Sequence, residues 1–208
     1  MPVATFSEGV GSVSFSFGRP PGPTNQTVWR TITFGSGSAI SGLDFNGYTQ
    51  TLFWGPNQFF TQSLSLPIID DNVYEGPNAE TFILTNDPSH DFAFTVEYAI
   101  EDNDPVPTVR IASAGTATEG EAALFTLVLS NPSYEAITVR LDTFGTDAEP
   151  GDWENAPQFV TFAPGETQKI VEVDTLQDLI NEPDEHFAGT LSVVGGTAIP
   201  IGSSTNIA

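Results

Sequence analysis

The chain carries one arrangement of acidic and aromatic residues twice, and this internal repeat constrains its fold more than any other feature. Glu8-Gly9 and Glu119-Gly120 each stand just before a run of alternating apolar residues, 111 positions apart. Four further pairs recur in the same order, 105 to 108 positions apart: Asp44-Phe45 with Asp152-Trp153, Asp71 with Asp178, Glu75 with Glu182, and Glu80 with Glu185. Loops of different length account for the drift in spacing. Such a repeat in 208 residues predicts two similar domains, each large enough for its own core.

The middle of the chain, residues 101–107, predicts the boundary between the two copies. It places three acids and an asparagine directly before two prolines, which neither a helix nor a central strand accommodates. Acidic oxygens crowded beside a stiff turn suit a Ca²⁺ ion, and a solvated acidic linker is the alternative. We therefore expect a first domain at residues 1–105 and a second at 106–208, with the last strand of the second cut short.

Both copies show the alternating polar and apolar pattern that is typical of strands. Val13, Phe15 and Phe17 alternate with serines, which predicts a strand with one face buried. The same reasoning predicts strands at residues 10–17, 28–34, 49–54, 60–69, 82–85, 92–100, 109–111, 123–129, 137–141, 159–162, 170–173 and 187–193. No stretch has a helical period over three turns. The chain is therefore expected to be all-β, with two tandem antiparallel sandwiches of immunoglobulin-like type.

The charge of the chain restricts its partners. Five Lys and Arg face 27 Asp and Glu, a net charge of −22, so nucleic acid and anionic membrane are excluded on electrostatic grounds and cations are favoured. A halophile's acidic surface is the alternative reading of this charge. The chain has no cysteine, so it cannot form disulfides or thiolate metal sites. It also has no run of 18 apolar residues, and membrane insertion is not expected.

The acids of the first copy predict a metal site. Loops at one end of a sandwich lie close together, so acids on several of them would repel one another unless a cation neutralised them. A Ca²⁺ ion takes six to eight oxygens, whereas Mg²⁺ requires a stricter octahedral geometry. The candidate ligands are Glu8, Asp44, Asp70, Asp71, Glu75, Glu80, Asp102, Asn103 and Asp104.

The second copy has fewer candidate ligands. They are Glu119, Asp152, Asp178, Glu182 and Glu185. Gln177 stands where the first copy has Asp70, and the chain has no counterpart of residues 102–104. The second copy is therefore expected to bind Ca²⁺ more weakly than the first, or not at all.

These residues resemble the Calx-β family of tandem β-sandwich modules, which occur in sodium–calcium exchangers and in large extracellular adhesion or aggregation proteins. The matching motifs are Glu119-Gly120, Gly151-Asp152-Trp153, the Phe-Ala-Pro-Gly-Glu-Thr of 162–167, the Asn-Glu-Pro-Asp-Glu-His-Phe of 181–187, the Ile-Asp-Asp of 69–71 and the Ile-Glu-Asp-Asn-Asp of 100–104. The resemblance implies Ca²⁺ ligands at the acidic positions named above. Asn103 stands where the family more often has an acid.

Several alternatives to a calcium-binding structural or adhesion module stay open at this point. Asp70-Asp71 resembles the carboxylate pair of a glycosidase, so an accessory domain of a glycoside hydrolase is one alternative. We expect no enzyme, because His90 and His186 are isolated and no nucleophile motif is present. The acidic junction also resembles that of cadherins, and a passive spacer without an ion would fit the same repeat. The resemblance implies an extracellular or cell-surface location.

The ends of the two copies suggest a further alternative. Only seven residues precede Glu8, so the opening strand of the first copy is expected to be short, and residues 206–208 supply only part of a last strand for the second. Open sheet edges recruit strands from elsewhere. We therefore expect either a piece of a longer array of neighbouring β domains, or a subunit that joins copies of itself head to tail into a filament.

Overall fold

The computed structural model describes residues 1–87, 93–180, 183–201 and 206–207. Its elements are strands, with one short 3₁₀ turn, and the chain forms two compact units. The first unit contains residues 1–71 and 77–103, and the second contains 104–208 together with 72–76. Among the residues described, no helix has the length and apolar character that crossing a bilayer requires.

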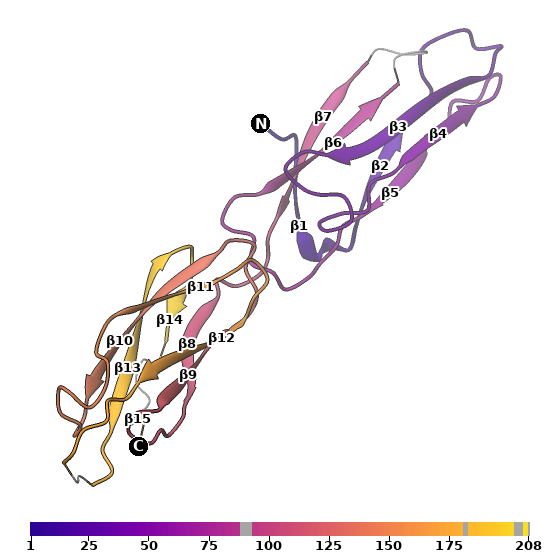
Figure 1. The fold of residues 1–208 in the computed structure, drawn as a ribbon. Coiled ribbons are helices and arrows are strands. Elements are labelled where there is room, and N and C mark those ends of the chain that lie inside the picture. The colour runs from indigo at the N-terminus through magenta and orange to yellow at the C-terminus, as the bar shows by residue number, and fades with distance from the viewer. Residues whose placement is uncertain (88–92, 181–182, 202–205, 208) are drawn as a thin grey trace. The chain divides into compact units, whose positions relative to one another are not determined.

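The first unit is a sandwich of two sheets (Figure 1). The larger sheet has the order β1-β7-β6-β3-β4, with bounds β1 Thr5–Ser7, β7 Thr95–Glu101, β6 Glu80–Asn86, β3 Val28–Ser36 and β4 Thr49–Trp54. The smaller sheet pairs β2, Ser12–Phe17, with β5, Gln62–Pro67. All of these pairs are antiparallel except β1 with β7, which is parallel.

The second unit is also a two-sheet sandwich. One sheet has the order β11-β10-β13-β15, with bounds β11 Gln158–Phe162, β10 Ile137–Gly145, β13 Phe187–Gly195 and β15 Asn206–Ile207. The other has the order β12-β9-β8-β14, with bounds β12 Gln168–Asp174, β9 Ala122–Leu129, β8 Thr108–Ala114 and β14 Ile199–Pro200. Each sheet contributes one face to a common core.

Alternating residues build the core of each unit. In β2 the three apolar side chains are buried and the three serines are exposed. Phe15 packs against Phe34 and Tyr98 at centroid distances of 5.2 and 5.0 Å. In the second unit Trp153 stacks on Phe187 at 5.2 Å. Burying each such side chain stabilises the fold by about 1.5–3 kcal/mol. The alternation of apolar and polar residues therefore decides which face of each strand turns toward the core.

The expected strands and the all-β class are confirmed, with some corrections at the ends of elements. The strand predicted from residue 10 begins at Ser12, because residues 8–10 form the 3₁₀ turn η1, Glu8–Val10, which Gly11 ends at φ 74°. The strand predicted at residues 60–69 spans Gln62–Pro67, and the strand predicted from residue 92 begins at Thr95. The short strands β1 and β15 agree with the short end strands expected from the sequence, whereas β14 has too few residues for its alternation to be visible. His90, Phe92 and Ala208 lie outside the described residues.

Candidate metal centre

Two strands bring one set of acids together in the first unit. Strand β1 pairs parallel with β7, with Ser7 opposite Glu101, so both strands end at the same side of the sheet. The residues that follow them, Glu8 and Asp102, therefore lie close together. Glu8 and Asp102 each place one carboxylate oxygen within 4.8 Å of the other, whereas Asp104 already belongs to the second unit. Only 2% of Glu8 is exposed, so its charge is held largely out of solvent.

A second group forms around the loop that follows β3. It contains Asp44 and Glu80, again with one oxygen from each within 4.8 Å, whereas the neighbouring candidate Glu75 belongs to the second unit. Asp44 is 6% exposed, and its carboxylate accepts a 2.5 Å hydrogen bond from the backbone N–H of Ile40. The fully buried ring of Phe45 anchors this loop in the core, which fixes the neighbouring carboxylate. The repeated acid-aromatic pair of the sequence thus combines a candidate ligand with its anchor.

The pKa of Glu80 reflects the negative charges that surround it in the first unit. Glu80 stands at the start of β6, opposite Ile100 of β7, and therefore near the acids that follow β7. Burial, a hydrogen bond with Asp44 and then the negative charges of Asp44, Asp102 and Glu8 raise its pKa to about 7. Four carboxylates from separate parts of the chain therefore interact, and a bound cation would remove the repulsion between them. Because every donor is a carboxylate oxygen, the set suits a hard cation such as Ca²⁺.

Asp70, Asp71 and Asn103 lie beside these groups. The amide nitrogen of Asn103 donates a 3.0 Å hydrogen bond to Asp70, and the backbone N–H of Asp71 donates a 3.2 Å bond to Glu8. A Cβ added to Gly9 would lie 2.7 Å from the Asn103 amide nitrogen. A side chain at position 9 would therefore require the Asn103 amide to move. Neither aspartate belongs to a three-acid group among the described residues.

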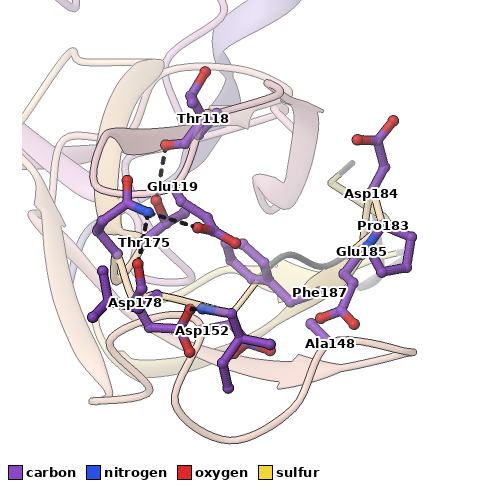
Figure 2. Close-up of a pocket in the computed structure, with 14 residues that line it drawn as sticks. Thr118, Glu119, Ala148, Asp152, Thr175, Asp178, Pro183, Asp184, Glu185 and Phe187 are labelled. Carbon is purple, nitrogen blue, oxygen red and sulfur yellow. Dashed lines mark hydrogen bonds between the residues drawn. The ribbon is translucent and has the colours of Figure 1, made fainter.

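The candidate ligands of the second unit line a pocket of about 590 Å³ (Figure 2). They are Glu119, Asp152, Asp178 and Glu185, whereas Glu182 lies outside the described residues. Asp184 also lines the pocket, and Figure 2 shows its carboxylate pointing away from Glu119. Asp184 was not among the ligands predicted from the sequence, where its only signal is its place between two candidate acids.

Neutral groups already hold the carboxylates of this pocket. The amide nitrogen of Gln177 donates a 2.9 Å hydrogen bond to Glu119. Backbone N–H groups of residues 149 and 180 donate to Asp152 and Asp178, at 2.5 and 2.6 Å. In the part of the second unit that the structure describes, no three acids share a 4.8 Å group. The pocket therefore differs from the first centre in geometry as well as in the number of its acids.

Comparison with known proteins agrees with this architecture. A profile of the Calx-beta domain matches residues 1–97 and again residues 102–205. The chain belongs to the Calx-beta family. The expected family and fold class, two tandem β-sandwich domains of Calx-beta type, are therefore confirmed. No curated protein shows significant sequence similarity to the chain.

The solved structures that match this chain include two described as CBD12. A crystal structure described as the calcium binding domain CBD12 of CALX1.1 is 20% identical, with 91% of this chain and 76% of that chain covered and a TM-score of 0.43. CBD12 from CALX1.2 is 15% identical, with 98% of this chain and 95% of that chain covered and a TM-score of 0.44. The described residues of this Calx-beta chain include acidic groups that could hold a metal ion.

Proposed function

We propose that this Calx-beta chain is a calcium-binding structural module. Its main site is formed by the acids that meet in the first unit, Glu8, Asp44, Glu80 and Asp102, which we call the acidic centre. The close approach of carboxylates from separate segments, Glu8 to Asp102 and Asp44 to Glu80, supports the proposal, because such carboxylates repel one another when no cation is bound. The role is binding rather than catalysis, since carboxylates that share one site with other acids suit an ion better than a substrate.

The Ca²⁺ ligands that we propose are the acids of the acidic centre and the oxygen-bearing residues beside it. They are Glu8, Asp44, Asp70, Asp71, Glu75, Glu80, Asp102, Asn103 and Asp104. Asp70 and Asp71 are included because hydrogen bonds tie them to Asn103 and Glu8, within reach of a small rearrangement. For the second unit we propose weak binding at most, because no three of its described acids share a 4.8 Å group and Gln177 stands where the first unit has Asp70.

We also propose that the ion stiffens the junction between the domains, which we place at residues 105 and 106. Asp102 and Asp104 lie within four residues of that junction in the sequence. An ion held by both would order the linker and reduce the freedom of one domain relative to the other. This role suits a repeat unit of an adhesion protein at the cell surface. Extracellular modules bind Ca²⁺ with Kd of about 10⁻⁴–10⁻³ M, which matches the ion level outside cells.

A calcium titration of the whole chain by calorimetry tests the main proposal. The double variant Asp44→Ala, Asp102→Ala removes one acid from each group of the first unit, and we expect it to lose most of the heat of binding. The matched control, Asp152→Ala with Asp178→Ala, makes the same change in charge at the pocket of the second unit and should keep that heat. The opposite pattern would show that the stronger site is in the second unit, and no heat in the unsubstituted chain would reject calcium binding.

A further inference from the structure

The two units differ at one sheet edge. Strand β9 of the second unit pairs with β12 on one side and with β8 on the other. Strand β2 holds the corresponding place in the first unit, since it also follows a Glu-Gly pair and a turn. Among the described residues, β2 pairs with β5 alone. The opposite edge of β2 therefore presents unpaired backbone groups.

The pattern of hydrogen bonds between β2 and β5 determines which backbone groups of β2 face its open edge. Ile68 donates its N–H to the carbonyl of Gly11, and antiparallel pairs alternate between bonded and non-bonded positions. The inward-facing residues of β2, including Phe15, therefore bond to β5. The N–H and C=O groups of Ser12, Ser14 and Ser16 point to the open edge. The strand has no charge, no proline and no bulge, although these are the usual protections of an edge.

A groove of about 490 Å³, lined by aromatic and aliphatic side chains together with Ser14 and Ser16, lies beside this edge, between β2 and the other sheet. Its lining comes from residues 13–17 of β2, from Leu84 of β6, from Val96 and Tyr98 of β7, and from the flanking Phe6 and Phe94. Side chains that enter the groove would contact aromatic rings, and a backbone beside it would reach the open N–H and C=O groups. The groove thus offers both parts of a strand-addition site.

The second unit shows what kind of segment fits such a position. There β8, seven residues long, runs antiparallel to β9 and places Val109 and Ile111 opposite Leu129 and Leu127. Both side chains are almost fully buried, whereas Arg110 between them is exposed. The fold therefore uses an extended segment with apolar residues at every second position to cover this edge. The segment needs no acid and no metal ligand.

We propose that the open edge of β2 and the groove beside it form an acceptor site for an extended segment of another polypeptide. The segment adds antiparallel to β2, bonds to the backbone of Ser12, Ser14 and Ser16, and inserts alternate apolar side chains into the groove. Its chemistry is that of β8: about seven residues with branched aliphatic side chains at alternate positions. This site is separate from the acidic centre and does not depend on calcium.

A labelled peptide with the sequence of residues 108–114 tests the proposal by fluorescence anisotropy, in chelator and in Ca²⁺. We expect saturable binding to the whole chain. A control peptide with serine in place of both Val109 and Ile111 keeps the charge of Arg110 and should not bind. In Ser14→Pro a donor at the open edge is removed, and we expect affinity to fall about tenfold or more.

Ser65→Pro is the matched control on the chain. Ser65 lies opposite Ser14 in a pair without mutual backbone bonds, so its N–H faces away from β2, and its carbonyl accepts from the hydroxyl of Tyr48 at 2.9 Å. Binding should survive this change. Equal affinity in both proline variants, or no binding to the unsubstituted chain, would overturn the proposal.

Hydrogen exchange of the unsubstituted chain gives a test that does not depend on how the variants fold. The amides of Ser12, Ser14 and Ser16 should become protected when the peptide is added, and unchanged exchange at these three amides would reject the acceptor site. If the chain alone self-associates and loses this association in Ser14→Pro, the occupant is a second copy, and the assignment to a separate polypeptide is wrong.

Discussion

At the scale of single residues, Glu80 links calcium binding to pH. Its pKa in the folded chain is about 7 against an ordinary value of 4.5. Between these two pH values the folded state holds a proton that the unfolded state has released, so the stability of the ion-free chain falls as pH rises through this range. Ca²⁺ binds the ionised carboxylate and therefore displaces that proton.

We expect calcium binding at pH 6.5 to release protons, and the apparent affinity to rise as pH increases from 6 to 8. Calorimetry in two buffers with different ionisation enthalpies measures the released proton directly. In Glu80→Gln the proton release should largely disappear while binding weakens. A heat of binding that is the same in both buffers would show that Glu80 is already ionised in the free chain.

Gln177 is the residue that most separates the second unit from the first. Its amide donates to Glu119, so it holds in place a carboxylate that an ion would otherwise use. In Gln177→Asp this donor is replaced by a further acid, and we expect calcium affinity at the second unit to rise about tenfold, since affinity follows the number of charged ligands.

Calorimetry on a chain that already carries Asp44→Ala and Asp102→Ala isolates this effect from the first unit. Gln168→Asp is the matched control, because it makes the same change in charge at an exposed position of β12. If Gln168→Asp increases the affinity as much as Gln177→Asp, the gain reflects overall charge rather than the pocket.

At the scale of elements, the turn η1 positions the candidate ligands between β1 and β2. Its conformation brings Glu8 into the unit, where the backbone of Asp71 donates to it. Gly9 leaves room for the amide of Asn103, which in turn holds Asp70. The turn therefore couples the end of β1 to the segments that follow β5 and β7.

Gly9→Ala should disturb this coupling. The added Cβ would lie 2.7 Å from the Asn103 amide nitrogen, so residue 103 has to move and its hydrogen bond to Asp70 weakens. We expect a loss of about 1 kcal/mol in stability, together with weaker calcium binding. Denaturant unfolding and calorimetry measure the two effects. Gly18→Ala is the control, because its added Cβ would meet nothing within 4 Å; equal losses in both variants would contradict the steric argument.

At the scale of the whole molecule, the proposed stiffening of the junction predicts a response to calcium. An ion held by Asp102 and Asp104 should narrow the range of arrangements that the two domains adopt. Small-angle scattering with chelator and with excess Ca²⁺ measures this change, and we expect a narrower distribution of distances when Ca²⁺ is present. Asp102→Ala with Asp104→Ala should remove the difference. Identical profiles in the unsubstituted chain would count against the coupling.

The sequence alone determined the repeat, the all-β class and most of the strands, because alternation over two residues is a local property that each segment carries by itself. It also identified Glu8, Asp44 and Glu80 as acids at recurring positions and Asp102 as part of the acidic run before the two prolines. It did not reveal the short strand β14 or the contribution of Asp184, because two residues show no period and a lone acid resembles any solvated one.

Only the tertiary structure decided which of these acids act together. Glu8 and Asp102 are far apart in the chain and meet because β1 and β7 pair in parallel, and Glu80 senses both because β6 lies next to β7. Open edges were expected from the sequence, but only the strand pairing places one of them at β2. Convergence of side chains and pairing of edges depend on contacts between distant segments, and no local pattern of residues contains that information.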